Sequence, residues 1–343
     1  IRRKDQADES ARITTETIAQ HREKILAGGR RFKYPVQYAR HRLVFNAIAI
    51  AVAVLVLMVA FVWWQLYLAQ NTSNFMYRVT KIVPLPVASV DGQAVAYSDY
   101  LMKYRSSIHY LEEKEQVNLS SEDGKRQSDF VKQQAMQDSI ADAYAVKLAK
   151  EKDITVSSVE LETFLKSQRN STDGEVSEST YEAVILDYYG WSPDEYRHAM
   201  ESKLLRQKVA FAIDTSASQT ADSIGKTIAG GNTDLLAIAE AVNQENGAQV
   251  TFASQGFVPR TNQDGGLAAA ASKLVKDQVS TLVKSTNGDG YYFVKLIDSN
   301  ETQVNYDYIH IPLTVFADQV NKALTSGKVS KYITIPEVTV TQE

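Results

Sequence analysis

Hydrophobic and polar positions follow three different patterns along this chain of 343 residues. The first is a charge-free run over residues 43–77, whose front part, 43–64, contains Asn46 as its single polar side chain. A helix that crosses a bilayer needs about 20 apolar residues. The run therefore predicts a transmembrane helix, which we place at 43–67. The alternative, a buried core helix of a soluble domain, requires neither this length nor the flanking residues described next.

Both ends of the apolar run carry residues typical of a membrane interface, with basic residues before it and aromatic residues at its end. The predicted membrane-interface residues are Arg30, Arg31, Lys33, Arg40, Arg42, Trp63, Trp64 and Tyr67. By the positive-inside rule, the N-terminus stays in the cytoplasm and the chain after the span is extracytoplasmic. Bulky residues, WWQLYL, stand where a signal peptide would have a small-residue cleavage site, so we expect an uncleaved single-pass anchor in the cell membrane.

The second pattern is a helical period that extends to residue 214, after a short hairpin. The hairpin has strands at 87–90 and 93–95, and Asp91-Gly92 provides the positive φ angles of its tight turn. We expect Ser98 to cap the first helix. Further helices are predicted at 128–152, from 157, at 180–189 and at 192–213.

The third pattern, alternation of apolar and polar residues, appears after Asp214 and predicts strands among helices. The strands are expected at 249–253, 291–297 and 303–311, and the helices at 216–229, 233–242, 267–275 and 315–324. This order is typical of an α+β domain that follows a mainly α module. The predicted regions are a basic tail (1–42), a transmembrane helix (43–67), a linker (68–86), a helical module (87–214), a sheet module (215–312) and a C-terminal extension (313–343).

The segments on the two sides of the predicted span differ in net charge. Residues 1–42 contain eleven Lys/Arg and five Asp/Glu, whereas residues 78–343 contain 26 Lys/Arg and 36 Asp/Glu. The basic tail suits an anionic inner leaflet of the bilayer. The acidic outer part argues against nucleic acid as a partner. The chain has no cysteine, which excludes disulfides and thiolate metal sites.

Several segments carry a resemblance to known exported proteins. VASVDGQAVAYSDY, ITVSSVELETFL and YYGWSPDEYRHAMESKLLRQKV resemble segments of the SurA/PpiD/PrsA family of membrane-anchored or exported foldases. QGFVPR, LVKDQVS and GYYFVKL are similar to the back half of a parvulin domain, where the pattern is L-G-W-V-P-R, L-K-x-G-Q-V-S and G-Y-H-I-I-K-L. Together the matches cover about residues 83–298. The resemblance implies a SurA-N-like helical chaperone module and a parvulin-like module with an antiparallel sheet.

The parvulin-like part departs from its family at the positions that matter for catalysis. Parvulins are prolyl isomerases that use no cofactor and hold the prolyl ring beside paired histidines. Tyr292 replaces one of these histidines, the usual opening strand A-R-H-I-L is missing between Ile213 and Ala221, and the pocket phenylalanine is Leu267 or an alanine. We therefore expect a degenerate parvulin-like module without efficient isomerase activity and without a cofactor.

The segment 304–313, VNYDYIHIPL, resembles the missing opening strand but follows the last parvulin strand. The resemblance puts Tyr308 at the histidine position. Because an antiparallel strand can follow its neighbour through a short turn, 304–313 can fill the vacant place in the sheet. The alternative is an additional edge strand. Tyr292 and Tyr308 are accordingly weak candidates for catalytic residues.

No other catalytic or metal-binding pattern is present. The five histidines lack metal-ligand spacing, and neither a G-x-S-x-G elbow nor a phosphate-binding loop occurs. Aromatic residues are unusually frequent in the helical module, and some are expected to bind unfolded chains adaptably. The client-binding candidates are Tyr100, Tyr104, Tyr188, Tyr189, Trp191 and Tyr196.

The sequence favours an extracytoplasmic, ATP-independent chaperone or foldase that binds unfolded or nascent exported polypeptides. A structural or adaptor subunit of an envelope or translocon-associated complex is the alternative, because fold does not establish function. An active peptidyl-prolyl isomerase is the third hypothesis. The expected partners are client polypeptides, the lipid bilayer and subunits of such a complex.

Overall fold

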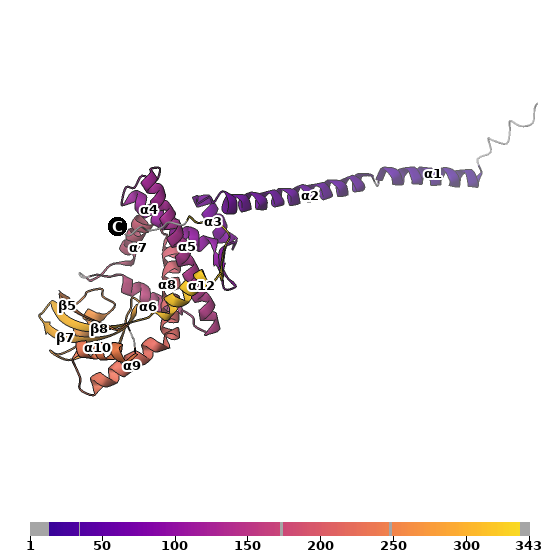
Figure 1. Ribbon diagram of the computed structural model, residues 1–343. Coiled ribbons are helices and arrows are strands. Elements are labelled where there is room, and N and C mark those ends of the chain that lie inside the picture. Colours follow the sequence, from indigo (N-terminus) through magenta and orange to yellow (C-terminus); the bar gives the residue numbers. More distant parts are fainter. Residues whose placement is uncertain (1–13, 34, 172–173, 247–248, 337–343) are drawn as a thin grey trace, which may run out of the picture. The chain divides into compact units, whose positions relative to one another are not determined.

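The N-terminal part of the chain is a pair of long helices. The computed structural model describes residues 14–33, 35–171, 174–246 and 249–336, and the chain divides into two compact units, 1–69 and 70–343. In the first unit, α1 (Thr15–Lys33) and α2 (Pro35–Trp63) are followed by a π-helical turn, η1 (Trp64–Leu68) (Figure 1). Within the described ranges, one stretch, His41–Leu68, is long and apolar enough to cross a membrane. Its side chains are largely exposed, so it is not a core helix of this unit.

The second unit begins with a helix that the sequence did not predict. Helix α3 (Asn74–Ile82) lies inside the segment 68–86, which we expected to be a linker, so that expectation is corrected. Ser73 caps α3 by accepting a hydrogen bond from the Met76 N–H, and Met76, Tyr77 and Thr80 are buried. The predicted hairpin then follows as β1 (Pro86–Val90) and β2 (Gln93–Ala96), which pair antiparallel.

Serine caps define most starts in the helical module. Its helices are α4 (Tyr97–Glu113), α5 (Glu122–Glu151), α6 (Ser158–Gln168), α7 (Glu178–Tyr189) and α8 (Pro193–Ile213). A minimal hairpin, β3 (Asn170–Ser171) and β4 (Gly174–Glu175), separates α6 from α7. Ser157 and Ser192 form complete capping boxes with the glutamates three residues later. Both of these starts agree with the helices predicted from 157 and from 192.

Two starts differ from the prediction. Helix α4 begins at Tyr97, and its N-cap is Ala96, which has no side-chain acceptor, so Ser98 lies inside the first turn and is not the cap. Helix α5 begins at Glu122, not near residue 128, because the Ser121 side chain caps it and Glu122 and Asp123 stand at its positive dipole end. Helix α1 runs from Thr15 through Gly28 and Gly29 to Lys33.

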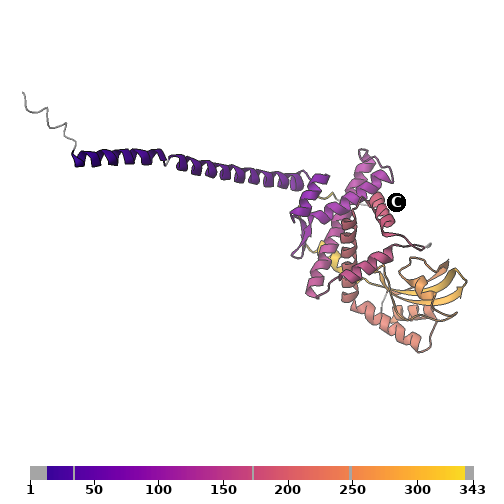
Figure 2. The same cartoon turned by 180° about the vertical axis from the view of Figure 1, so that it is seen from behind.

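The sheet module has helices on both faces of one antiparallel sheet. Helices α9 (Thr215–Ala229) and α10 (Leu235–Asn246) precede strand β5 (Thr251–Pro259), helix α11 (Leu267–Ala271), and strands β6 (Val283–Lys284), β7 (Gly290–Ser299) and β8 (Gln303–Pro312). Figure 2 shows the same layers from behind. Alternate residues of the strands pack on opposite faces. Ile309 packs under α9 and α10, whereas Tyr292 and Tyr306 pack under α11.

Strand β8 lies inside the sheet. The strand order is β5-β8-β7-β6, so β8 pairs antiparallel with both β5 and β7. The alternative in which residues 304–313 add an edge strand is therefore wrong. Val304, Tyr306 and Ile309 are fully buried, as expected for a central strand.

The C-terminal segment completes the helical module. Helix α12 (Val315–Thr325) packs beside α5 and α8, and its Phe316 contacts the core formed by Leu148 and Val209 (Figures 1 and 2). Strand β9 (Val329–Lys331) pairs antiparallel with β1. Residues 313–336 are thus not an appended extension, because α12 packs on α5 and α8 and β9 pairs with β1. Residues 337–343 lie outside the described residues.

Candidate functional site

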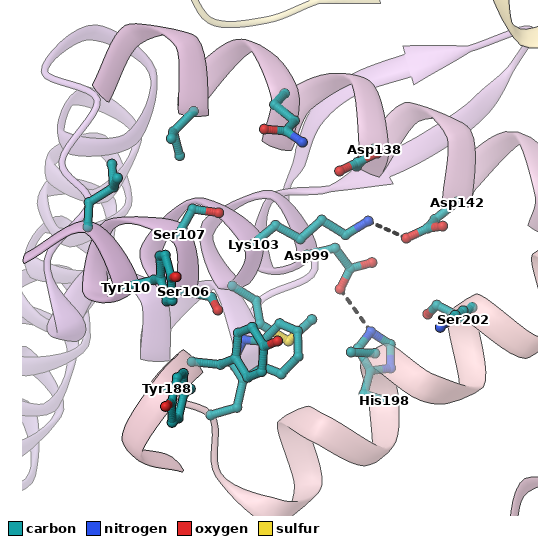
Figure 3. Close-up of a pocket in the computed structure, with 18 of the residues that line it drawn as sticks. Asp99, Lys103, Ser106, Ser107, Tyr110, Asp138, Asp142, Tyr188, His198 and Ser202 are labelled. Carbon is teal, nitrogen blue, oxygen red and sulfur yellow. Dashed lines mark hydrogen bonds and ion pairs between the residues drawn. The ribbon is translucent and has the colours of Figure 1, made fainter. Parts of the chain in front are cut away.

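A groove of about 1050 Å³ opens among α4, α5, α7 and α8 (Figure 3). Each of these helices buries one face in the module core and turns another face toward the groove. The apolar part of the lining includes Met102, Phe130, Val131, Tyr188, Trp191 and Met200. Methionine and aromatic side chains adapt to differently shaped apolar ligands, so this lining suits a variable polypeptide.

The aromatic end of the groove depends on a glycine turn between α7 and α8. Gly190 has φ +64° and ends α7 in the left-handed conformation, which glycine adopts without a steric cost. The turn brings Tyr189 and Trp191 together, with ring centroids 5.2 Å apart. Tyr188 is 45% exposed, and the Lys114 ammonium lies 4.8 Å from its ring centroid. The groove thus presents aromatic surface to solvent.

The opposite end of the groove carries paired charges. Lys103 forms an ion pair with Asp142, and the Arg206 guanidinium lies 3.2 Å from the same carboxylate. The His198 Nε2 and Asp99 Oδ1 atoms are 3.0 Å apart, so this pair connects α8 to α4. Figure 3 marks the Lys103–Asp142 and His198–Asp99 pairs with dashed lines. The hydrogen bond to Asp99 raises the pKa of His198 above its usual value against the opposing effect of burial.

Three of the six client-binding candidates line the groove, and three do not. Tyr188, Tyr189 and Trp191 belong to the lining. Tyr100 and Tyr104 are buried, 2% and 8% exposed, and stack on each other in the core with centroids 6.2 Å apart. Tyr196 is also buried and donates a hydrogen bond to the Tyr181 hydroxyl. These three tyrosines lie in the core and not in the groove lining, because helical spacing alone does not tell the core face from the groove face.

The two candidate catalytic tyrosines share one face of the sheet. Tyr292 on β7 and Tyr308 on β8 have ring centroids 5.8 Å apart. The residue directly opposite Tyr292 is His310, which stacks on it at 4.5 Å, so the register puts His310, not Tyr308, in the paired position. His310 was not among the candidate residues, because the five histidines lack metal-ligand spacing in the sequence. The sequence could have indicated His310 through the strand period of two, which puts residues 306, 308 and 310 on one face of β8.

Two of the tyrosine hydroxyl groups on this face already have acceptors. The Tyr292 hydroxyl donates to Asp289 Oδ2 at 2.7 Å, and the Tyr306 hydroxyl donates to Asp264. Burial and the adjacent Asp289 carboxylate raise the pKa of Tyr292 above its usual value. Tyr292 is therefore a protonated, fixed donor at neutral pH.

The predicted membrane-interface residues fall partly outside the described side chains. Trp63 and Trp64 are 55% and 50% exposed at the end of the apolar helix, and the Trp63 and Tyr67 rings lie 6.2 Å apart. Arg42 is exposed. The side chains of Arg30, Arg31, Lys33 and Arg40 lie outside the described part of the chain. Among the residues that the structure describes, no group of three or more histidine, cysteine or acidic side chains could hold a metal ion.

A family model described as the SurA-like N-terminal domain matches residues 40–210. This range contains the apolar stretch His41–Leu68 and all the residues that line the groove. The match supports a family of the SurA/PpiD type and a chaperone-type folding factor that works outside the cytoplasm. A comparison with curated proteins gives no match.

Proposed function

We propose that this protein is a membrane-anchored, extracytoplasmic chaperone that binds unfolded exported polypeptides without ATP. The observation that carries the proposal is the open groove of about 1050 Å³, with exposed aromatic residues at one end and paired charges at the other. Apolar side chains of an unfolded client would contact the aromatic and methionine lining. Polar backbone groups of the client would stay near Lys103 and Asp142, which offer a donor and an acceptor.

The anchor determines where the chaperone acts. In the proposed orientation, α2 spans the membrane with the basic tail in the cytoplasm and the second unit outside. The charge difference between residues 1–42 and 78–343 supports this orientation. The chain has no cysteine of its own, so single cysteines introduced at Ile25 or at Leu236 test this orientation. An impermeant thiol reagent added to intact cells should label the cysteine at position 236 alone. Labelling at position 25 alone would reverse the orientation.

Aggregation of a chemically denatured client tests the chaperone activity. The fragment should contain residues 70–343, because a fragment starting at 78 would cut through α3. The fragment should suppress aggregation, and the double variant Tyr188→Ala with Phe130→Ala should suppress it less. Tyr332→Ala is the matched control, since Tyr332 is 45% exposed like Tyr188 but lies outside the groove lining. No suppression at a several-fold molar excess would refute the proposal.

Crosslinking in cells separates the chaperone from an adaptor subunit. A photoreactive amino acid at Tyr188, in the groove, should capture many exported polypeptides. One stoichiometric partner in place of a broad set would instead support a structural subunit of an envelope complex. A broad set captured equally from position 332 would refute the groove as the binding surface.

We further propose that the sheet module is parvulin-like and has no efficient prolyl isomerase activity. The strand order β5-β8-β7-β6 supports β8 as the replacement of the missing opening strand. Catalysis requires groups that favour the twisted amide over both planar isomers. On this face, the Tyr292 hydroxyl, which stands at the position of one parvulin histidine, already donates to Asp289 and is not a free donor.

A further inference from the structure

Helix α3 has a second face that its contacts within the unit do not use. Its inner face is fixed: the Tyr77 hydroxyl donates to Glu195 Oε1 at 2.7 Å, and the Arg105 guanidinium lies 5.3 Å from the Tyr77 ring centroid. Lys81 adds an ion pair with the same Glu195 oxygen at 3.4 Å. These contacts attach α3 to α4 and to the first turn of α8, where the aromatic end of the groove begins.

The outer face of α3 is apolar and exposed. Phe75 is 65% exposed and Ile82 is 82% exposed. They are seven residues apart, so they lie on the same side of the helix two turns from each other. Arg78 lies between them on this side and is exposed, and Val83, 45% exposed, extends the apolar surface beyond the helix end. Large apolar residues on one exposed side of a helix can insert at a bilayer interface. A long arginine side chain among them can extend its charged end to the headgroups.

The chain itself limits how far α3 can lie from the end of the apolar helix. Five residues, 69–73, separate Leu68 from Asn74. Fully extended, they span at most about 20 Å. This segment is also held in place, because the Arg105 guanidinium donates to the Thr72 carbonyl oxygen at 2.9 Å and Ser73 caps α3. If α2 spans a bilayer, α3 therefore starts within about 20 Å of the end of the apolar helix, which is close enough for its outer face to reach the headgroup region.

We propose that the outer face of α3 binds the lipid surface, with Phe75 and Ile82 inserted below the headgroups and Arg78 among anionic phosphates. This inference rests on the proposed membrane anchor and adds a second membrane contact to it. The contact fixes the direction in which the groove opens, since the inner face of α3 is joined to α8 close to Trp191. A single flexible tether would leave that direction free.

The absence of cysteine makes a direct test practical. The full-length chain is reconstituted into vesicles of phosphatidylcholine and phosphatidylglycerol, with one spin-labelled cysteine per variant. The variants are Phe75→Cys and Ile82→Cys on α3, Phe61→Cys in the apolar helix, and Leu236→Cys as an exposed control, 47% exposed on α10. Collision rates of each label with oxygen, which concentrates in lipid, and with a water-soluble nickel complex are measured by electron paramagnetic resonance.

The expected result is a higher oxygen-to-nickel collision ratio at positions 75 and 82 than at 236, with the highest ratio at 61. A ratio at 75 and 82 equal to that at 236, with 61 in lipid, would refute the docking of α3 and leave the anchor intact. Aqueous ratios at all four positions would refute the anchor and the docking together. In vesicles of phosphatidylcholine alone, the ratios at 75 and 82 should fall if Arg78 binds anionic headgroups, and unchanged ratios would refute that part of the proposal.

Discussion

Replacement of Asp214 tests the connection between the two modules. Asp214 is 1% exposed at the junction of α8 and α9. Its Oδ1 accepts hydrogen bonds from the Ser216 hydroxyl at 2.7 Å and the Ala217 N–H at 3.0 Å, which caps α9. Its Oδ2 accepts from the N–H groups of Thr314 and Val315, at 2.8 and 3.1 Å, at the start of α12. One carboxylate therefore stabilises two helix starts that are a hundred residues apart.

The expected cost of Asp214→Ala follows from these bonds. Loss of the cap on α9 costs about 1 kcal/mol. The N–H groups of Thr314 and Val315 would lose their acceptor in a partly buried site, which adds about 1–3 kcal/mol. We expect a total loss of about 2–4 kcal/mol in the free energy of unfolding, a large fraction of the roughly 5–15 kcal/mol of an ordinary domain.

Urea unfolding of the fragment 70–343 measures this loss, with Trp191 as its single tryptophan and circular dichroism as a second probe. Asp234→Ala is the matched control, because exposed Asp234 caps α10 through one bond to the Ala237 N–H and its loss should cost about 1 kcal/mol or less. Hydrogen exchange at the start of α12 should accelerate in Asp214→Ala and not in Asp234→Ala. Equal unfolding free energies for the two variants would refute the reasoning.

The same carboxylate predicts a dependence on pH. Burial acts to raise the pKa of Asp214, but the hydrogen bonds from Ala217, Ser216, Val315 and Thr314 outweigh it and hold the pKa below the usual value. A lowered pKa in the folded state means that the stabilisation is present above about pH 4 and is lost as the pH falls through the folded pKa. Asp214→Asn should remove this part of the acid sensitivity. An unchanged acid transition in Asp214→Asn would contradict the assignment.

Three further predictions concern single contacts. The hydrogen bond to Asp99 raises the pKa of His198, so the pair should stabilise the fold below about pH 6.5 and lose this effect as the pH rises through the raised pKa. The stabilisation should be less than about 1 kcal/mol, because both side chains are partly exposed. In Asp99→Asn, the pKa of His198 measured by NMR titration should shift down. Gly124→Ala should destabilise the fragment by about 1–3 kcal/mol, because the new Cβ would lie 2.1 Å from the Asn118 carbonyl oxygen. Gly225→Ala, whose Cβ would lie 3.4 Å from its nearest neighbour, should stabilise the fragment by up to about 1 kcal/mol. A lower melting temperature for Gly225→Ala than for Gly124→Ala would be decisive against this packing. The fragment should not accelerate cis–trans exchange of an Xaa-Pro peptide beyond a few-fold, and Tyr292→Phe should leave suppression of aggregation intact; a robust isomerase rate that Tyr292→Phe abolishes would overturn the scaffold interpretation.

Local signals in the sequence predicted most helix and strand positions. The serine and glutamate pairs at Ser157 and Ser192 define their helix starts without help from distant residues. The start of α5 was missed because Gly124 reads as a loop residue. In the structure, the backbone at residue 118 approaches this position so closely that a side chain would not fit.

Tertiary contacts determine which face of a helix is buried and which strand residues pair, and the sequence did not predict either. The tyrosines of α4 were predicted to bind clients, but Tyr100 and Tyr104 lie on the face that packs into the core, while Tyr188 at the end of α7 lies in the groove. Helical periodicity shows that residues share a face and not what covers that face. The register of β8 against β7, which pairs His310 with Tyr292, depends on a hairpin whose exact pairing only the folded sheet shows.

The pairing of β9 with β1 has a consequence for biogenesis. The Tyr332 hydroxyl and the Ser89 hydroxyl lie 3.1 Å apart although 243 residues separate them in the chain. In the proposed orientation, the chain after α2 crosses the membrane in sequence order, so the first hairpin emerges long before α12 and β9. The helical module therefore stays open at one side, with β1 lacking its second neighbour, until β9 has emerged. During that interval the nascent protein is itself an incompletely folded exported polypeptide, which is the class of client that we propose this protein binds.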